Sequence, residues 1–136
     1  CTGGLLCGRL VNYPGISRAL IEGNVTYSND AKVRRLGVRP ETLQMFGAVS
    51  KETAAEMAQG AARTSGAHIG ISTTGLAGPG GGSAEKPVGL VYVGLYMDGK
   101  VYVKELNLSG DRQSIRNRTV TIALDFLRRK LISNSK

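Results

Sequence analysis

The sequence is poor in the residue types on which several classes of protein depend. Its 136 residues include two cysteines, one histidine, two phenylalanines and no tryptophan. Two cysteines in one short apolar segment do not make a disulfide framework, so we expect reduced thiols at Cys1 and Cys7. With His68 as the only histidine, a zinc site would be unusual, and we predict no metal and no cofactor.

Long hydrophobic runs are lacking as well. No stretch approaches the roughly 18 apolar residues that a membrane span needs, and no charged and apolar leader precedes a small-residue cleavage site. We therefore expect a cytoplasmic protein that does not bind membranes. Hydrophobic residues make up 41% of the chain and charged residues 21%, which is typical of one compact globular domain over residues 1–136.

Acidic residues are fewer than basic ones. The chain has 18 lysines and arginines against 10 aspartates and glutamates, a formal net charge of +8. Nucleic acid is nevertheless an unexpected partner, because the few aromatic residues are not interleaved with the basic ones. Much of the basic charge falls on one predicted helix in the last third of the chain, where a solvated face is the simplest explanation. A small anionic substrate would also suit a positive field.

The stretch 71–89, ISTTGLAGPGGGSAEKPVG, is the most informative part of the sequence for function. A β-branched run ends at Gly75, and a loop rich in glycine and proline follows. Glycines allow main-chain N–H groups to approach a ligand closely, as an anion or an oxyanion requires. A flexible surface loop is the alternative explanation. We hypothesise a binding loop at the end of a strand.

Turn and capping signals divide the rest of the chain into helices and strands. Helices are expected at 5–11, 18–22, 30–36, 40–46, 51–65 and 112–131, and strands at 24–28, 69–74, 88–97 and 101–108. Asp98 and Gly99 form the strongest hairpin signal. Early alternation of helices with strands, followed by an antiparallel hairpin, predicts an α/β fold, a three-layer α/β/α sandwich with a mixed sheet.

Three positions outside the loop are also candidates for function. Lys32 lies in the first turn of the helix 30–36, where a cation opposes the helix dipole, although a solvated surface lysine is the more common case. The turn of Thr2, Gly3 and Gly4 precedes the helix 5–11, whose unpaired N–H groups suit a phosphate or carboxylate. Ser17 is most simply a helix N-cap.

Eight ordered blocks of the sequence resemble one known family. The blocks are CTGG (1–4), PGIS (14–17), VTYSN (25–29), AK (31–32), GAVS (47–50), TGLAGP (74–79), KPVG (86–89) and GDR (110–112). Together they look like the successive motifs of the CinA C-terminal domain, a family that includes nicotinamide mononucleotide deamidases. Members of that family begin earlier, with a helix and a strand ending in Glu-Ser, and often carry a second serine where this chain has Ile16.

The resemblance implies hydrolysis of the amide of nicotinamide mononucleotide to the acid and ammonia, in pyridine nucleotide recycling. It implies a Ser/Lys dyad, with Ser17 as the nucleophile and Lys32 as the general base, which must be neutral to accept a proton. The residues that it implies for substrate binding are Tyr27, Asn29, Thr74, Gly75, Thr2, Gly3, Gly4 and Arg112. Tyr27 would orient the lysine or the nicotinamide, the strand end and the N–H groups of residues 75–78 would bind the oxyanion, and residues 2–4 with Arg112 would bind the phosphate.

Other interpretations stay open at this point. The domain could instead be a non-catalytic module of a competence and damage-inducible protein that binds a nucleotide or a partner. A tyrosine packed in a strand and an arginine on a solvated helix turn are the simple alternatives for Tyr27 and Arg112. We also expect a homo-oligomer, a small-molecule nucleotide as the ligand, and a fused N-terminal domain in longer family members.

Overall fold

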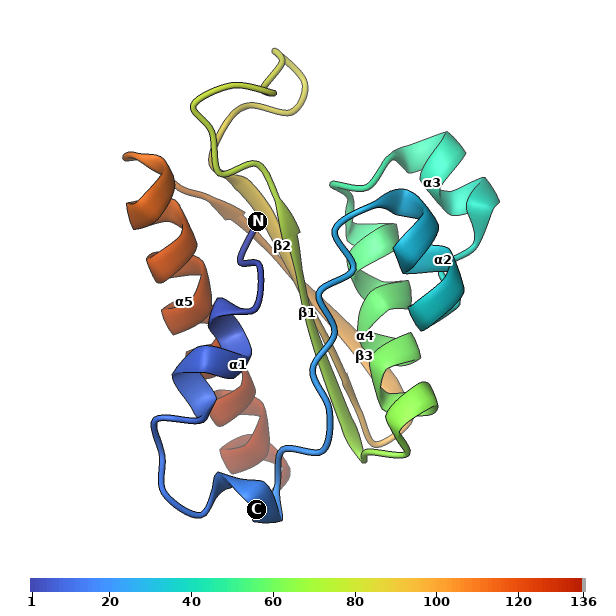
Figure 1. Cartoon of the computed structure of the whole chain (residues 1–136), viewed down its shortest axis with the longest axis vertical. Helices are drawn as coiled ribbons and strands as arrows, with labels where there is room; N and C mark the ends of the chain where they lie inside the picture. Colours follow the sequence, from blue (N-terminus) through green and yellow to red (C-terminus); the bar gives the residue numbers. More distant parts are fainter. Residues whose placement is uncertain (136) are drawn as a thin grey trace.

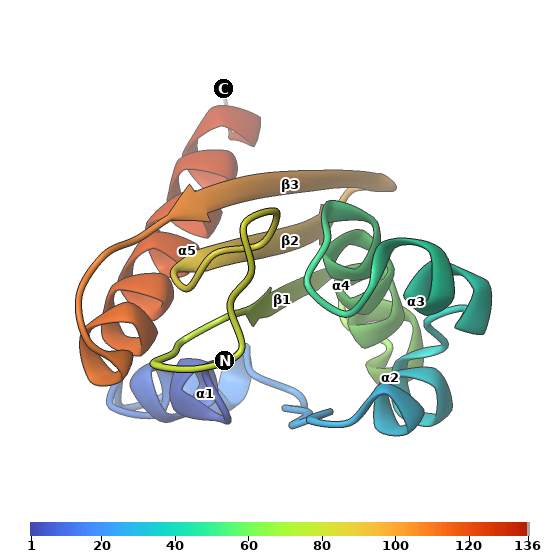
Figure 2. The same ribbon diagram turned by 90° about the horizontal axis from the view of Figure 1, so that it is seen from above.

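The structure is a computed structural model that describes residues 1–135, and its elements form three layers (Figure 1). The elements are α1 (Leu5–Leu10), η1 (Ile16–Arg18), α2 (Asn29–Leu36), α3 (Pro40–Phe46), α4 (Lys51–Ser65), β1 (Ile69–Gly75), β2 (Leu90–Met97), β3 (Lys100–Asn107) and α5 (Arg112–Asn134). Helices α1 and α5 lie on one side of the sheet, and α2, α3 and α4 lie on the other (Figure 2). The predicted α/β class and the three layers are confirmed.

The sheet is antiparallel throughout, which corrects the expected mixed sheet. Its strand order is β1-β2-β3, with pairs running from Ile69 opposite Met97 to Gly75 opposite Val91 and on to β3. The segment predicted as a strand at 24–28 runs alongside β1 in Figure 1, but it forms no β-ladder with that strand. In place of the helix expected at 18–22 there is only the short turn η1. A β-branched run indicates an extended chain, but it does not specify a pairing partner.

Side chains cap three of the helices, whereas Ser17, expected as an N-cap, lies inside η1, whose N-cap position is Gly15. Ser28 Oγ accepts a hydrogen bond from the Ala31 N–H at 3.0 Å and caps α2. Ser50 caps α4 in the same way, and Asp111 caps α5. These oxygens satisfy N–H groups that the first helical turn leaves unpaired. The caps fix where each helix begins, including the turn of α2 that carries Lys32.

Small residues let α4 pack with its backbone directly on the sheet. A Cβ built on Gly70 of β1 would lie 1.9 Å from the Ala58 carbonyl oxygen, and one on Gly94 of β2 would lie 2.3 Å from that of Ala54. No larger side chain fits at either strand position without moving the helix. The side of α4 that carries Ala54 and Ala58 is therefore a contact surface, and it gives β1 a rigid support.

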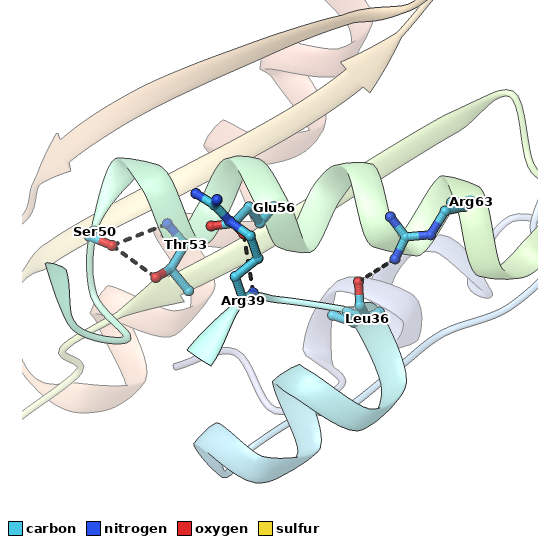
Figure 3. A network of polar contacts seen from close by, with 6 residues as sticks. All are labelled: Leu36, Arg39, Ser50, Thr53, Glu56 and Arg63. Atoms are coloured by element: carbon cyan, nitrogen blue, oxygen red, sulfur yellow. Dashed lines mark hydrogen bonds and ion pairs between the residues drawn. The ribbon is translucent and has the colours of Figure 1, made fainter. Parts of the chain in front are cut away.

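Polar contacts tie α2 and the start of α3 to α4 (Figure 3). Arg63 Nη2 of α4 donates to the carbonyl oxygen of Leu36, the last residue of α2, at 2.9 Å. Arg39, just before α3, pairs with Glu56 through a 3.2 Å contact from Nε to Oε1. Val38 is buried in the same small core. These contacts set the position of α2 relative to the sheet.

The main core lies on the opposite face of the sheet, between the strands and α5. Its buried residues are Ala77, Val91, Val93, Leu106, Ile115 and Ala123. Cys1 and Cys7 are free thiols near α1, as the sequence predicts. Within residues 1–135, no helix has the length and the apolar character that crossing a membrane would take.

Candidate active site

A cavity of about 400 Å³ lies along the open edge of β1. Its walls come from the turn at residues 1–4, the extended segment 19–27, strand β1 and the first residues of the glycine-rich loop. Lys32 of α2 and Arg112 of α5 also line it, so both helical layers contribute. A volume of this size is in the range that holds a small molecule.

Lys32 is the most unusual side chain of the cavity. The residue is only 6% exposed, and its ammonium group donates to the carbonyl oxygens of Thr26, at 2.8 Å, and Tyr27, at 3.4 Å. Burial lowers the pKa of Lys32, because the charged form loses its hydration. No carboxylate is bonded to it among the described contacts, so no bonded anion there opposes the effect of burial on this pKa. A lysine that loses its proton readily is suited to general-base catalysis.

Arg112 and Tyr27 lie together where the cavity opens. Arg112, in the first turn of α5, donates through Nη1 to the Gly78 carbonyl oxygen at 2.7 Å and through Nη2 to the Tyr27 hydroxyl at 3.5 Å. Tyr27 is 72% exposed, so its ring is available to a ligand. A guanidinium group has five N–H donors, and the remaining ones can bind an anion.

The turn before α1 forms another wall. Thr2 is buried, and its Oγ1 lies 2.7 Å from Thr73 Oγ1 of β1. Gly3 and Gly4 have φ values of 59° and 92°, which residues with a Cβ seldom adopt. Arg116 Nη2 donates to the Thr2 carbonyl oxygen at 3.0 Å and so holds this turn on α5. The predicted residues 2–4 and Arg112 thus line one cavity.

The strand end is partly committed to structural hydrogen bonds. Thr74 Oγ1 donates to the Ala48 carbonyl oxygen at 2.6 Å, and Gly75 is the last β1 residue paired with β2. The Leu76 N–H donates to the Leu90 carbonyl oxygen at 2.9 Å, which removes it from the expected set of oxyanion donors. Thr74 and Gly75 do line the cavity, and Ala77 and Gly78 follow them there.

Ser17 does not meet Lys32 in this structure. It lies exposed in η1, at the opposite end of the sheet from the first turn of α2 (Figure 1), and within the described residues it does not line the cavity. Residues 19–28 connect the two positions, and ten residues in extended form span on the order of 30 Å. Of the two residues expected in the dyad, Lys32 lines the cavity and Ser17 is not among its lining residues.

Asn29 also lies away from the cavity. It is the first residue of α2 and is exposed, whereas its neighbours in sequence Tyr27 and Lys32 line the cavity. The structure therefore gives Asn29 no contact with the predicted site.

Sequence reasoning missed two residues that shape the cavity. Arg116 follows Arg112 by one helical turn, so the spacing of two arginines four apart on α5 was a usable signal. Thr73 precedes Thr74 in β1, so the side chains of the two residues point to opposite faces of the sheet. Neither residue stands out by composition, and their roles follow from which segments pack against them.

A comparison with known protein families gives one match over nearly all of the chain. The model of the CinA C-terminal domain matches residues 1–131. The chain belongs to this family. The resemblance seen in the eight sequence blocks is thereby confirmed.

Curated relatives of this chain carry the name competence-damage inducible protein. One from Clostridium tetani is 67% identical over 132 residues, and one from Clostridium acetobutylicum is 65% identical over 133 residues. These matches cover 97% and 98% of this chain but 32% of each relative. The chain therefore spans about a third of the length of the curated relatives that it matches.

Solved structures of CinA proteins have the same fold. A competence/damage inducible protein from Agrobacterium tumefaciens superposes with a TM-score of 0.91 at 50% identity, over 93% of this chain and 78% of that one. One from Klebsiella pneumoniae gives 0.93 at 36% identity, over 97% and 82%. The arrangement of layers around the cavity is thus shared with CinA proteins whose structures have been determined.

Proposed function

We propose that this CinA domain hydrolyses the amide of nicotinamide mononucleotide to the acid and ammonia, with Lys32 as the general base. The observation that supports the proposal most directly is a buried lysine with a lowered pKa in a cavity of nucleotide-binding size. The resemblance of the sequence blocks to nicotinamide mononucleotide deamidases supplies the substrate. The Arg112 guanidinium group at the cavity favours a substrate that carries a phosphate.

The reaction needs a nucleophile, a proton acceptor and donors for the oxyanion. In our scheme a water molecule attacks the amide carbon while neutral Lys32 takes its proton. The N–H groups of Ala77 and Gly78 stabilise the negative carbonyl oxygen of the tetrahedral intermediate. Its C–N bond then breaks, and the Lys32 ammonium returns the proton to the leaving nitrogen, which departs as ammonia and leaves a carboxylic acid.

The substrate orientation follows from the walls of the cavity. We infer that the phosphate binds at the Arg112 guanidinium and the turn of Thr2, Gly3 and Gly4, on the α5 side. The nicotinamide then lies toward Tyr27 and the end of β1, with its amide between Lys32 and residues 74–78. Tyr27 would stack on the pyridine ring, and Thr74 and Gly75 would contact the amide from the strand end.

The direct test is ammonia release from nicotinamide mononucleotide by the purified chain, with Lys32→Met as the inactive variant. Ser17→Ala is the matched variant, because our scheme leaves its activity unchanged while the family dyad requires its loss. If Ser17→Ala is inactive, mixing it with Lys32→Met distinguishes the remaining cases. Recovery of activity in the mixture would mean that the pair forms between two copies of the chain, and the water scheme would be abandoned.

A binding module is the second candidate function, and the position of Ser17 favours it. A domain in which the implied nucleophile lies at the far end of the sheet from Lys32 could hold a nucleotide without hydrolysing it. Isothermal titration calorimetry with nicotinamide mononucleotide, run beside the ammonia assay, separates the two functions. Binding heat without ammonia release supports the module, and release supports the enzyme.

A further inference from the structure

The glycine-rich loop, residues 76–89, rises above the end of β1 in Figure 1 and lies between α5 and α3 when seen from above in Figure 2. Its base is closed by two backbone hydrogen bonds, from the Leu76 N–H to Leu90 O at 2.9 Å and from the Gly89 N–H to Leu76 O at 2.7 Å. On the α5 side, Arg112 bonds the Gly78 carbonyl oxygen. The base and one side of the loop are therefore fixed.

The opposite side of the loop is held by Lys86. Its ammonium group donates to the carbonyl oxygen of Phe46, the last residue of α3. Ser83 and Lys86 form a tight turn, with the Ser83 N–H bonded to Lys86 O at 2.8 Å and the Lys86 N–H to Ser83 Oγ at 3.0 Å. Carbonyl groups at a helix C-terminus lack intrahelical partners and carry partial negative charge, so an ammonium group is a favourable partner there.

The residues that follow Phe46 connect this contact to the cavity. A Cβ on Gly47 would lie 3.0 Å from Lys86 Nζ, so the ammonium group sits directly on this backbone. Ala48 is the next residue and lines the cavity. Its carbonyl oxygen accepts a hydrogen bond from the Thr74 hydroxyl. On the loop side, Gly78 and Gly80 line the same cavity. Lys86 thus links two segments of the cavity wall without being part of that wall.

We propose that Lys86 is a positioning residue for the site: it holds the glycine-rich loop against the α3–α4 turn and thereby sets the width of the cavity mouth. The proposal rests on the proposed function, because it assigns Lys86 an effect on the binding of the mononucleotide. Lys86 does not line the cavity, so its removal leaves Lys32 and the chemical step in place. The oxyanion donors stay in place as well, because Arg112 still bonds the Gly78 carbonyl oxygen. The effect therefore falls on the part of the wall that begins at Gly80, and hence on substrate binding.

The kinetic experiment compares Lys86→Met, which keeps the aliphatic stem, with Lys86→Arg, which keeps a cationic donor. Loss of one hydrogen bond from a charged group predicts a KM for nicotinamide mononucleotide about tenfold higher in Lys86→Met, with kcat within about twofold. Lys86→Arg should restore KM to within about threefold of the original value. Lys51→Met, the same charge change on an exposed lysine at the start of α4, should change neither constant.

Hydrogen exchange without substrate separates this proposal from the proposed function. In Lys86→Met the amides of residues 80–88 should exchange about tenfold faster, while those of α4 exchange as before. Unchanged loop exchange together with an unchanged KM would overturn the role of Lys86. If the unaltered chain releases no ammonia, the proposed function fails, and the Kd of the mononucleotide then takes the place of KM in judging Lys86.

Discussion

Replacing Lys32 with methionine should separate catalysis from stability. Methionine fills a similar volume, so the packing around α2 is kept. The change removes two hydrogen bonds from a charged donor, worth roughly 1.5–3 kcal/mol each, and deprives the Thr26 carbonyl oxygen of its 2.8 Å partner. It also removes the ammonium group of a residue that is only 6% exposed, and burying such a charge costs several kcal/mol. The two contributions nearly cancel, so we expect the unfolding free energy to change by less than about 2 kcal/mol.

The lowered pKa of Lys32 makes this stability difference depend on pH. Burial lowers the pKa in the folded chain, while the unfolded chain keeps the ordinary value of about 10.4. Between those two values the unfolded state binds more protons, so the unfolding free energy of the unaltered chain rises with pH relative to Lys32→Met. Below the folded-state pKa both states are charged, and the destabilising effect of burying the ammonium group is complete.

Two measurements check this prediction. Both proteins are unfolded with urea at about pH 7 and about pH 10. At the higher pH, the unfolding free energy of the unaltered chain should be larger relative to that of the variant. Ammonia release should fall by about 10²–10⁴-fold in Lys32→Met, and in the unaltered chain it should rise with pH as Lys32 loses its proton. A variant within tenfold of full activity, or a stability difference that does not vary with pH, would refute the role given to Lys32.

Four further changes test the fold and the binding residues. Gly70→Ala should destabilise the protein by about 1–3 kcal/mol or more, since its Cβ would lie 1.9 Å from the Ala58 carbonyl oxygen. Gly8→Ala, where nothing lies within 4 Å, should instead stabilise α1 by about 0.5–1 kcal/mol, both read from urea midpoints. Arg112→Ala should raise KM for nicotinamide mononucleotide at least tenfold, and an unchanged constant would move the phosphate site elsewhere. Tyr27→Phe should keep KM within about threefold, because ring stacking does not need the hydroxyl, and a larger rise would assign the hydroxyl a direct contact.

The elements of the fold followed from local signals in the sequence because their causes are local. Ser50 and Asp111 cap the predicted helices, and Asp98 with Gly99 makes the predicted hairpin with φ values of 54° and 76°. The mixed sheet and the strand at 24–28 did not follow, because strand pairing depends on neighbours distant in sequence. The same holds for Gly70, whose importance comes from the Ala58 backbone across the layer.

The cavity residues were easier to predict than their mutual geometry. Lys32 could be placed in the first turn of its helix from sequence alone, and the structure adds that Thr26 and Tyr27 accept its hydrogen bonds. The pairing with Ser17 required the path of residues 19–28, which carries no turn or capping signal that would bring the two ends together. An extended segment keeps residues that are distant in sequence apart in space. The turn η1, which carries Ser17, and the first turn of α2, which carries Lys32, therefore lie toward opposite ends of the sheet.

The candidate functional residues at the cavity come from the ends of helices and strands rather than from their middles. Gly75 ends β1, Arg112 begins α5, Lys32 lies in the first turn of α2, and Gly4 immediately precedes α1. Element ends are where backbone groups lack partners, so a ligand can take hydrogen bonds that the fold does not supply. The interiors of the same elements are fixed by backbone contacts such as Gly94 against α4. A rigid interior with unsatisfied ends is the physical basis of our proposal that this domain binds an anionic substrate beside Lys32.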